Sequence, residues 1–304
     1  MVRRIINGKE VSTKKFESLY PFESQSLNCN GHNLHYVDQG KGEAIVMVHG
    51  NPTWSFYYRH MIQGLSKNFR TIAPDHIGCG FSDKPGPGDY EYTLASRIKD
   101  LDTLIQHTVP QGKINLMVHD WGGMIGLAWA LEHLDRVGKI IITNTAGFFL
   151  PKEKRLPLAL WMVKHIPGFG AASILGLNGF VESALLVGAK KGLAPSIKSG
   201  LRAPYNSWRN RMATLKFVQD IPLTPADPAW ALVDRVSQNL DRLSQDQLLL
   251  LWGARDFVFD LNFYKEFKKR FPKAQSQVFE TAGHYLFEDE PKACLERVQN
   301  FLLS

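Results

Sequence analysis

Residues 114–131 read INLMVHDWGGMIGLAWAL, and this stretch decides the fold. The apolar run over residues 114–118 predicts a buried strand, and the apolar pattern over residues 124–131 predicts a helix. The sharp turn between them centres on Asp120. A residue at such a strand-to-helix turn is held on a strained backbone with its side chain exposed above the sheet. We therefore expect Asp120 to be presented as a nucleophile.

A carboxylate at this position limits the chemistry. An aspartate that attacks a carbonyl carbon forms a labile anhydride, whereas attack on an alkyl carbon forms an ester that water can later split. Asp120 therefore favours reactions at an alkyl carbon or a strained ring over ordinary ester hydrolysis.

Eight strand-like runs alternate with helical patterns along the chain, over residues 26–29, 34–38, 44–49, 70–74, 114–118, 139–143, 248–252 and 276–279. The residues between 94 and 107 carry apolar side chains at the spacing of one buried helical face. This alternation predicts an α/β fold with a mostly parallel, twisted sheet covered on both sides and short antiparallel strands first. Active residues should lie on loops at the carboxyl ends of the strands.

The rhythm breaks over residues 151–235, which are rich in Pro, Gly and aromatic residues and show no recurring strand signal. We predict an inserted helical cap there, with residues 1–150 and 236–304 forming the core. A cap excludes water and offers an apolar wall to a substrate. The aromatic residues expected to line that pocket are Phe148, Phe149, Trp161, Phe180, Trp208 and Phe217. The alternative is that such aromatics only join the cap to the core.

A nucleophile at this turn needs a base and an acid, and both follow in the expected order. Asp256 comes just after the strand-like run at 248–252, and His284 comes just after the run at 276–279. His284 can take a proton from water while Asp256 fixes its tautomer and stabilises the cation. Asp260 is the alternative acid, although it lies further from the strand end, and helix capping is the competing interpretation for either aspartate.

Two neutral donors lie near the expected position of Asp120. The loop after the third strand-like run carries Asn51, and its backbone N–H groups can face the turn. The Asn51 amide and the Trp121 indole N–H add side-chain donors that suit a halide or a released carboxylate. His49 and His119 are interpreted as structural, His119 because a residue next to the nucleophile in the strand points to the opposite face.

Composition excludes several classes. The net charge of +7 lies in residues 151–235, where twelve Lys or Arg face five Asp or Glu, which leaves 24 of each elsewhere. That segment is either a solvated basic surface or a site for an anionic partner or membrane surface. Nucleic-acid binding is not expected, since no basic run alternates with stacking aromatics. The three cysteines lie far apart without metal-type spacing, and no long apolar run is present, so we expect a soluble cytoplasmic protein without metal or cofactor.

The motifs over residues 49–52, 74–85 and 120–121 resemble the haloalkane dehalogenase family of α/β hydrolases, and the resemblance extends from Leu19 to Phe301. It implies Asp120 as nucleophile, His284 as base, Asp256 as acid, and Asn51 with Trp121 as the anion-stabilising pair. Asn144 stands after the sixth strand where another acid could stand, which supports Asp256.

Within that family, the segments over residues 203–208, 217–223 and 252–260 resemble the OleB type, the β-lactone decarboxylases of bacterial long-chain olefin biosynthesis. The resemblance implies a hydrophobic cis-dialkyl β-lactone as substrate, a cis alkene and CO2 as products, and an assembly with a β-lactone synthetase for which the basic cap could be the docking face. Haloalkane dehalogenation is the first alternative, because the same five residues would serve it.

Two further enzyme activities and one non-catalytic role fit these residues less well. An epoxide hydrolase needs cap tyrosines, and this cap has only Tyr205. A fluoroacetate dehalogenase needs arginine at the position of Trp121. A non-catalytic assembly or binding module would be expected to have lost part of the Asp, His and Asp set, which is complete here.

Overall fold

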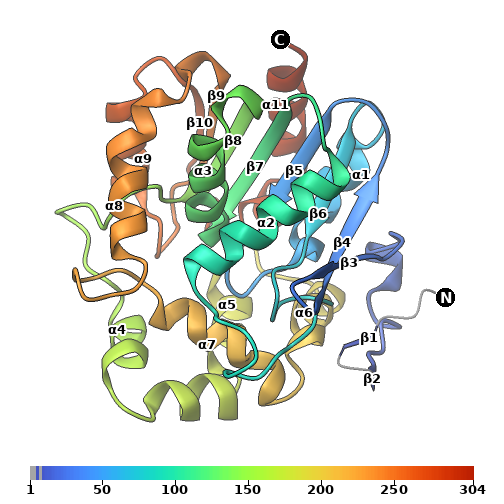
Figure 1. Ribbon diagram of the computed structural model, residues 1–304, viewed down its shortest axis with the longest axis vertical. Coiled ribbons are helices and arrows are strands. Elements are labelled where there is room, and N and C mark those ends of the chain that lie inside the picture. The colour runs from blue at the N-terminus through green and yellow to red at the C-terminus, as the bar shows by residue number, and fades with distance from the viewer. Residues whose placement is uncertain (1–4, 7–8) are drawn as a thin grey trace.

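The computed structural model describes residues 5–6 and 9–304. Its main sheet has eight strands in the order β10-β9-β8-β7-β5-β6-β4-β3 (Figure 1). Their bounds are β3 (Gln25–Cys29), β4 (His32–Gln39), β5 (Ala44–Val48), β6 (Arg70–Pro74), β7 (Ile114–Asp120), β8 (Val137–Thr145), β9 (Leu248–Gly253) and β10 (Gln275–Phe279). All eight predicted strands are present, and the α/β-hydrolase fold is confirmed. A separate pair joins β1 (Ile5–Ile6) to β2 (Lys9–Glu10).

The pairing of the strands agrees with the expected topology. β3 pairs with β4 and β4 with β6 in antiparallel fashion, while the remaining pairs of the main sheet are parallel. In β7, Leu116 and Val118 join one apolar cluster, and Met117 between them joins another. Because successive strand residues point to opposite faces, an unbroken apolar run buries both faces of the sheet.

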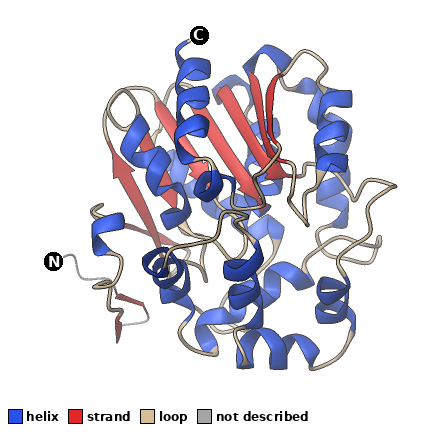
Figure 2. Cartoon of the chain, turned by 180° about the vertical axis from the view of Figure 1, so that it is seen from behind, coloured by secondary structure: helices blue, strands red, loops and turns tan. Residues whose placement is uncertain are grey.

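Helices cover each of those faces, so the sheet lies between two helical layers (Figure 2). The helices α1 (Arg59–Leu65) and α11 (Pro291–Leu303) pack together on one face. The other face is covered by α2 (Leu94–Thr108), α3 (Trp121–Glu132), α8 (Trp230–Asn239) and α9 (Leu261–Arg270). The short helices are α10 (Leu286–Asp289), η1 (Glu17–Leu19), η2 (Ser55–Tyr58), η3 (Leu134–Arg136), η5 (Ala203–Tyr205), η6 (Arg209–Arg211), η7 (Leu240–Arg242) and η8 (Gln245–Gln247).

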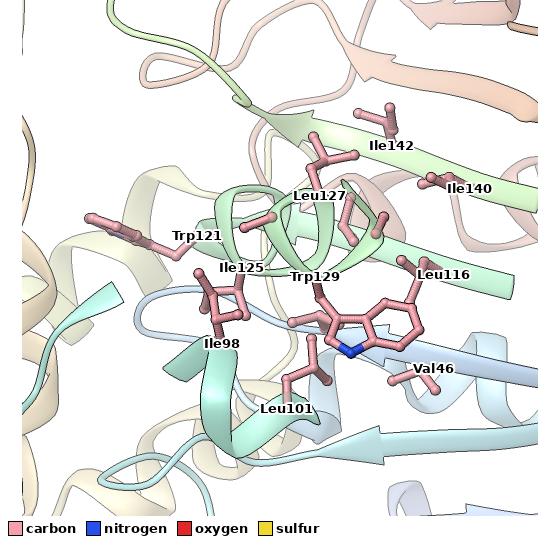
Figure 3. Packing of buried hydrophobic residues seen from close by; sticks show 14 of the residues in the cluster. Val46, Ile98, Leu101, Leu116, Trp121, Ile125, Leu127, Trp129, Ile140 and Ile142 are labelled. Carbon is pink, nitrogen blue, oxygen red and sulfur yellow. The ribbon is translucent and has the colours of Figure 1, made fainter. Parts of the chain in front are cut away.

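The central helix α3 is buried between α2 and the strands. Trp129 lies among Leu101, Leu116 and Val46 (Figure 3). Trp121, in the first turn of α3, belongs to the same cluster, but its side chain extends away from Trp129 and the residues around it. One end of this helix therefore anchors the sheet, while its first residue is free to face the inserted segment.

The segment between β8 and α8, which we call the cap, is helical and lies at one end of the sheet (Figure 1). Its helices are α4 (Leu158–His165), the π-helix η4 (Ala171–Gly176), α5 (Gly179–Val187), α6 (Pro195–Arg202) and α7 (Met212–Gln219). The predicted cap boundary at residue 235 falls inside α8, which packs against α3 of the core. In the described residues, no helix has the length and apolar character needed to cross a membrane.

Candidate active site

The turn after β7 has the strained geometry expected of a nucleophile elbow. Asp120 has φ 52° and ψ −128°, outside the regions that most residues adopt. Two residues later, a Cβ added to Gly122 would lie 1.9 Å from the Val48 carbonyl oxygen, so only glycine lets α3 approach β5 this closely. The Thr145 hydroxyl donates a hydrogen bond to the Asp120 carbonyl. Strand packing thus holds the turn from both sides.

The Asp120 carboxylate is buried but has donors around it. The backbone N–H of Asn51 donates to Oδ1 at 2.6 Å, and the backbone N–H of Trp121 also donates to the carboxylate. Burial raises the pKa of Asp120 to about 6, against the opposing effects of His284 and these two N–H groups. With a pKa of about 6, the Asp120 carboxyl is mostly ionised at neutral pH.

The loop that carries Asn51 passes very close to this carboxylate. A Cβ at Gly50 would lie 2.0 Å from Oδ1, so glycine is required at that position.

His284 lies between two carboxylates. Its Nδ1 is 2.8 Å from Asp256 Oδ2, and its Nε2 is 3.7 Å from Asp120 Oδ2. Burial alone would lower the pKa of His284, but the neighbouring Asp256 and then Asp120 raise it above its ordinary value. The bond to a carboxylate assigns the proton of the neutral ring to Nδ1, which leaves Nε2 to accept a proton near Asp120.

The two candidate acids have different surroundings. Asp256 accepts hydrogen bonds from the backbone N–H groups of Val258 and Phe259 at 2.7 and 3.1 Å, in addition to its bond to His284. Asp260 caps α9 through the N–H of Asn262, and its other oxygen is 3.0 Å from Lys154 Nζ. Asp256 is thus the carboxylate that meets His284, and Asp260 caps α9, which was its competing interpretation.

The histidines interpreted as structural lie behind the site. His119 Nε2 is 2.9 Å from the carbonyl oxygen of His284, to which it donates, and the two rings are 4.6 Å apart. His49 Nδ1 donates to the Gly50 carbonyl at 2.7 Å, and its Nε2 accepts from the N–H of His76. Burial lowers the pKa of His49 to about 4 and that of His119 well below its usual range. These neutral rings fix the two loops that flank Asp120.

Asn51 and Trp121 both line the cavity above Asp120. One N–H of the Asn51 amide donates to the Thr214 carbonyl of the cap at 3.1 Å. A side-chain amide carries two N–H groups, so this bond uses one of them. Asn51 Oδ1 is buried and has no hydrogen-bond partner among the described residues.

The cavity that these residues share measures about 350 Å³ and is lined by residues of both the core and the cap. Asp120, Trp121, Asn51 and His284 form its core end. Most of the remaining lining is apolar and comes from both the core and the cap, whose members include Leu160, Val163, Phe169, Ile174, Val218 and Ile221 beside the polar Lys154, Ser173 and Ser183. A polar cluster at one end of an apolar chamber suits a hydrophobic molecule with one reactive polar group.

The aromatic residues expected in the pocket divide into two groups. Phe148, Phe149 and Phe180 line the cavity. Trp161 and Trp208 lie on the surface instead, with exposed fractions of 44% and 53%, so the prediction is wrong for both. Phe217 is fully buried beside Trp121, with ring centroids 5.4 Å apart, and supports that ring rather than lining the cavity. On short helices joined by irregular loops, the sequence pattern does not show which side chains face the cavity and which face solvent.

Several site residues were missed. Phe257, Val258 and Phe259 line the cavity, and the Phe259 ring stacks on His284 at 6.1 Å. Their place directly after Asp256 was the signal that could have found them. Asn144 accepts from the Gly253 N–H at 2.8 Å and donates to the Gly253 carbonyl, so it holds the strand that carries Asp256. The sequence showed only that Asn144 stands where another acid could stand, and gave no sign of these hydrogen bonds.

Comparison with known proteins gives the family. Residues 43–291 match the model of the α/β-hydrolase fold family. The chain belongs to the α/β-hydrolase family. It is 42% identical to the cis-3-alkyl-4-alkyloxetan-2-one decarboxylase of Shewanella oneidensis, over 94% of this chain and 90% of that one.

Haloalkane dehalogenases are more distant relatives. The chain is 32% identical to haloalkane dehalogenase 2 of Mycobacterium bovis, over 90% of this α/β hydrolase and 92% of the relative. The crystal structure of the haloalkane dehalogenase DatA from Agrobacterium tumefaciens superposes with a TM-score of 0.82. The superposition covers 92% of this chain and 96% of the DatA chain, at 24% sequence identity. The two proteins therefore share the same fold.

Proposed function

We propose that this α/β hydrolase is a β-lactone decarboxylase, which converts a cis-dialkyl β-lactone to a cis alkene and CO2. The observation that carries the proposal is the 42% identity to a cis-3-alkyl-4-alkyloxetan-2-one decarboxylase over nearly the whole chain, against 32% to a haloalkane dehalogenase. The polar cluster at one end of an apolar cavity supports the same class of substrate.

In the first proposed step, Asp120 attacks not the carbonyl carbon but the alkyl-substituted ring carbon that is bonded to the ring oxygen. A bond forms between a carboxylate oxygen of Asp120 and that carbon, and the ring carbon–oxygen bond breaks. The released oxygen becomes part of a carboxylate on the substrate. Preorganised neutral donors stabilise such a developing anion, and Asn51 and Trp121 line the cavity beside Asp120. Relief of ring strain assists the attack.

In the second proposed step, the substrate carboxylate leaves as CO2. The electrons of the breaking carbon–carbon bond form the double bond, and the ester bond to Asp120 breaks, which regenerates its carboxylate. The first step inverts the attacked carbon, so loss of CO2 opposite the new ester gives a cis alkene from a cis lactone. Water is not consumed on this route.

The pair of His284 and Asp256 gives the site a second possible outcome. His284 Nε2 is 3.7 Å from Asp120, where it can activate a water molecule against an alkyl ester. Haloalkane dehalogenation is therefore the second candidate, in which Asp120 displaces halide and water then releases the alcohol. The identity to haloalkane dehalogenase 2 favours this alternative over epoxide opening.

One experiment separates the two candidates. Purified protein is offered a cis-dialkyl β-lactone and, separately, 1,2-dibromoethane, and alkene is measured by gas chromatography and bromide by ion chromatography. Alkene without bromide is the expected result. Bromide without alkene would overturn the proposal in favour of dehalogenation. The Asp120→Ala variant controls for spontaneous decay of either compound.

The cytoplasm is the proposed compartment. All three cysteines, Cys29, Cys79 and Cys294, are buried and free, and a cell compartment that keeps thiols reduced fits them. The expected association with a β-lactone synthetase also remains a proposal, and co-purification of the two proteins would test it.

A further inference from the structure

The cap helix α7 touches both side chains proposed to bind the anion. The Thr214 carbonyl accepts the hydrogen bond from Asn51 Nδ2 at 3.1 Å. The Phe217 ring packs on Trp121 with centroids 5.4 Å apart and an angle of 48° between the ring planes. Residues three apart lie on one face of a helix, so a single face of α7 contacts Asn51 and Trp121 together. A shift of α7 would move both donors.

Arg97 of the core helix α2 holds this face of α7 from the other side. Its side chain is fully buried, and its guanidinium carbon lies 3.7 Å from the centre of the Phe217 ring. One guanidinium nitrogen donates to the Tyr92 carbonyl at 3.0 Å and lies 3.7 Å from Asp220 Oδ2. Asp220 follows α7 directly and also accepts from the Leu94 N–H at 2.6 Å. The end of α7 is thus tied to the first turn of α2.

Phe217 is the central member of this arrangement. One face of its ring meets the Arg97 cation, and the ring also packs against Trp121. A guanidinium over an aromatic face is attracted by the ring quadrupole, more strongly when both groups are out of water. The orientation of the Trp121 indole therefore depends on a ring whose own place depends on Arg97.

Burying this arginine is costly for the fold. Its Nε and one terminal nitrogen have no hydrogen-bond partner in residues 5–6 and 9–304. An apolar side chain of similar volume would join two helices at lower cost, because a buried charge loses its hydration. A purely structural role therefore explains the position poorly, and a role in orienting the anion donors explains why a planar cation is present.

We infer that Arg97 is a positioning residue for anion stabilisation, which acts through α7 by fixing Phe217 against Trp121 and Thr214 against Asn51. This inference rests on the proposed function only in taking Asn51 and Trp121 as the anion donors. Arg97 does not touch the reacting atoms. It sets where the two donors point, so its loss should weaken anion binding more than a comparable loss elsewhere.

Bromide is the probe, because a bound bromide quenches the fluorescence of an adjacent indole without any turnover. The Trp121→Phe variant gives the quenching due to the other tryptophans. We expect Arg97→Met to raise the bromide dissociation constant about tenfold and Arg97→Lys by less, since lysine keeps the charge but not the planar fork. Phe217→Leu should act in the same direction with Arg97 intact.

Arg59→Met is the matched control. Arg59 is also buried, lies 4.4 Å over the Phe56 ring and pairs with a carboxylate, Glu288, on the opposite face of the sheet. The Arg59→Met variant should lower the melting temperature at least as much as Arg97→Met does. Its bromide affinity should stay within about twofold of the wild-type value. Unchanged bromide affinity in Arg97→Met and Phe217→Leu would overturn the inference, and the second variant decides the matter if the first does not fold.

Failure of the inference and failure of the proposed function give different results. If the wild type binds bromide through Trp121 and Arg97→Met weakens that binding, the inference stands even when no alkene forms from a β-lactone. If quenching by bromide is the same in the wild type and Trp121→Phe, the anion donors are misassigned and the inference is wrong.

Discussion

The core and the cap hold their parts of the cavity in different ways. In the core, residues of the sheet alternate between two large apolar clusters, and the reactive residues follow directly from strand ends. In the cap, Val163, Ile174, Leu175, Leu215 and Val218 form a small separate cluster, while other buried cap residues such as Leu185 and Phe217 join the two large clusters. Close packing holds buried side chains in fixed positions, because little free space lies around them. All the residues proposed to react lie in the core, whereas the apolar lining of the cavity comes from the core and the cap together.

Charge also distinguishes the two regions. The basic excess of residues 151–235 is partly met by carboxylates of the core, since Lys154 lies 3.0 Å from Asp260 and Lys191 lies 2.6 Å from Glu290. Within the cap, Arg202 pairs with Glu182. Part of the charge that suggested an external partner thus joins the cap to the core.

The largest effect should come from the core. Asp120→Ala removes the nucleophile, and turnover of either substrate should fall about 10⁴-fold or more. Asp260→Asn is the matched control, because Asp260 caps α9 away from His284; it should keep activity within about twofold. Initial rates by gas chromatography and ion chromatography provide the measurement. Substantial turnover by Asp120→Ala would refute the assignment of the nucleophile.

A change in the cap should alter binding more than chemistry. Phe180 lines the cavity. Phe180→Ala removes apolar contact worth about 1.5–3 kcal/mol, so KM for a long-chain substrate should rise about tenfold or more while kcat changes little. Trp161→Ala serves as the control, since the Trp161 side chain is on the surface with 44% exposed. A similar KM change in both variants would contradict the division between lining and surface aromatics.

The pH dependence of kcat/KM should reflect the protonation of two core residues, Asp120 and His284. Asp120 attacks only when ionised, so kcat/KM should fall about tenfold per pH unit as the pH drops below its pKa of about 6. The hydrolytic route also needs neutral His284, whose pKa is raised, and so should require a higher pH. Rates from pH 4.5 to about 9 with each substrate test this. A flat profile down to pH 4.5 would show that burial does not raise the pKa of Asp120.

The smallest effect should come from an ion pair between cap and core. Lys191 is 52% exposed and pairs with Glu290. Exposed pairs contribute about 0–1 kcal/mol, so Lys191→Gln should lower the free energy of unfolding in urea by no more than that. A loss of several kcal/mol would mean that charge, rather than apolar contact, holds the cap in place.

Most of the core could be predicted because its signals are local. A strand buried on both faces shows as an unbroken apolar run, and the elbow at Asp120 is a strand, a turn and a helix in sequence. The order of Asp120, Asp256 and His284 then follows from the strand ends. The cap could not be predicted in this detail, since Trp161 and Trp208 belong to short helices whose exposed faces depend on how the helices pack.

The sequence by itself determined the eight strands, the elbow, and the choice of a carboxylate over a hydroxyl at the reactive position, because each depends on residues adjacent in the chain. Only the tertiary structure decided which acid meets His284, which aromatics line the cavity, and that Arg97 and Phe217 stand behind Trp121. These contacts join residues far apart in sequence, and burial, hydrogen bonding and packing select them only when the sheet and the cap have come together.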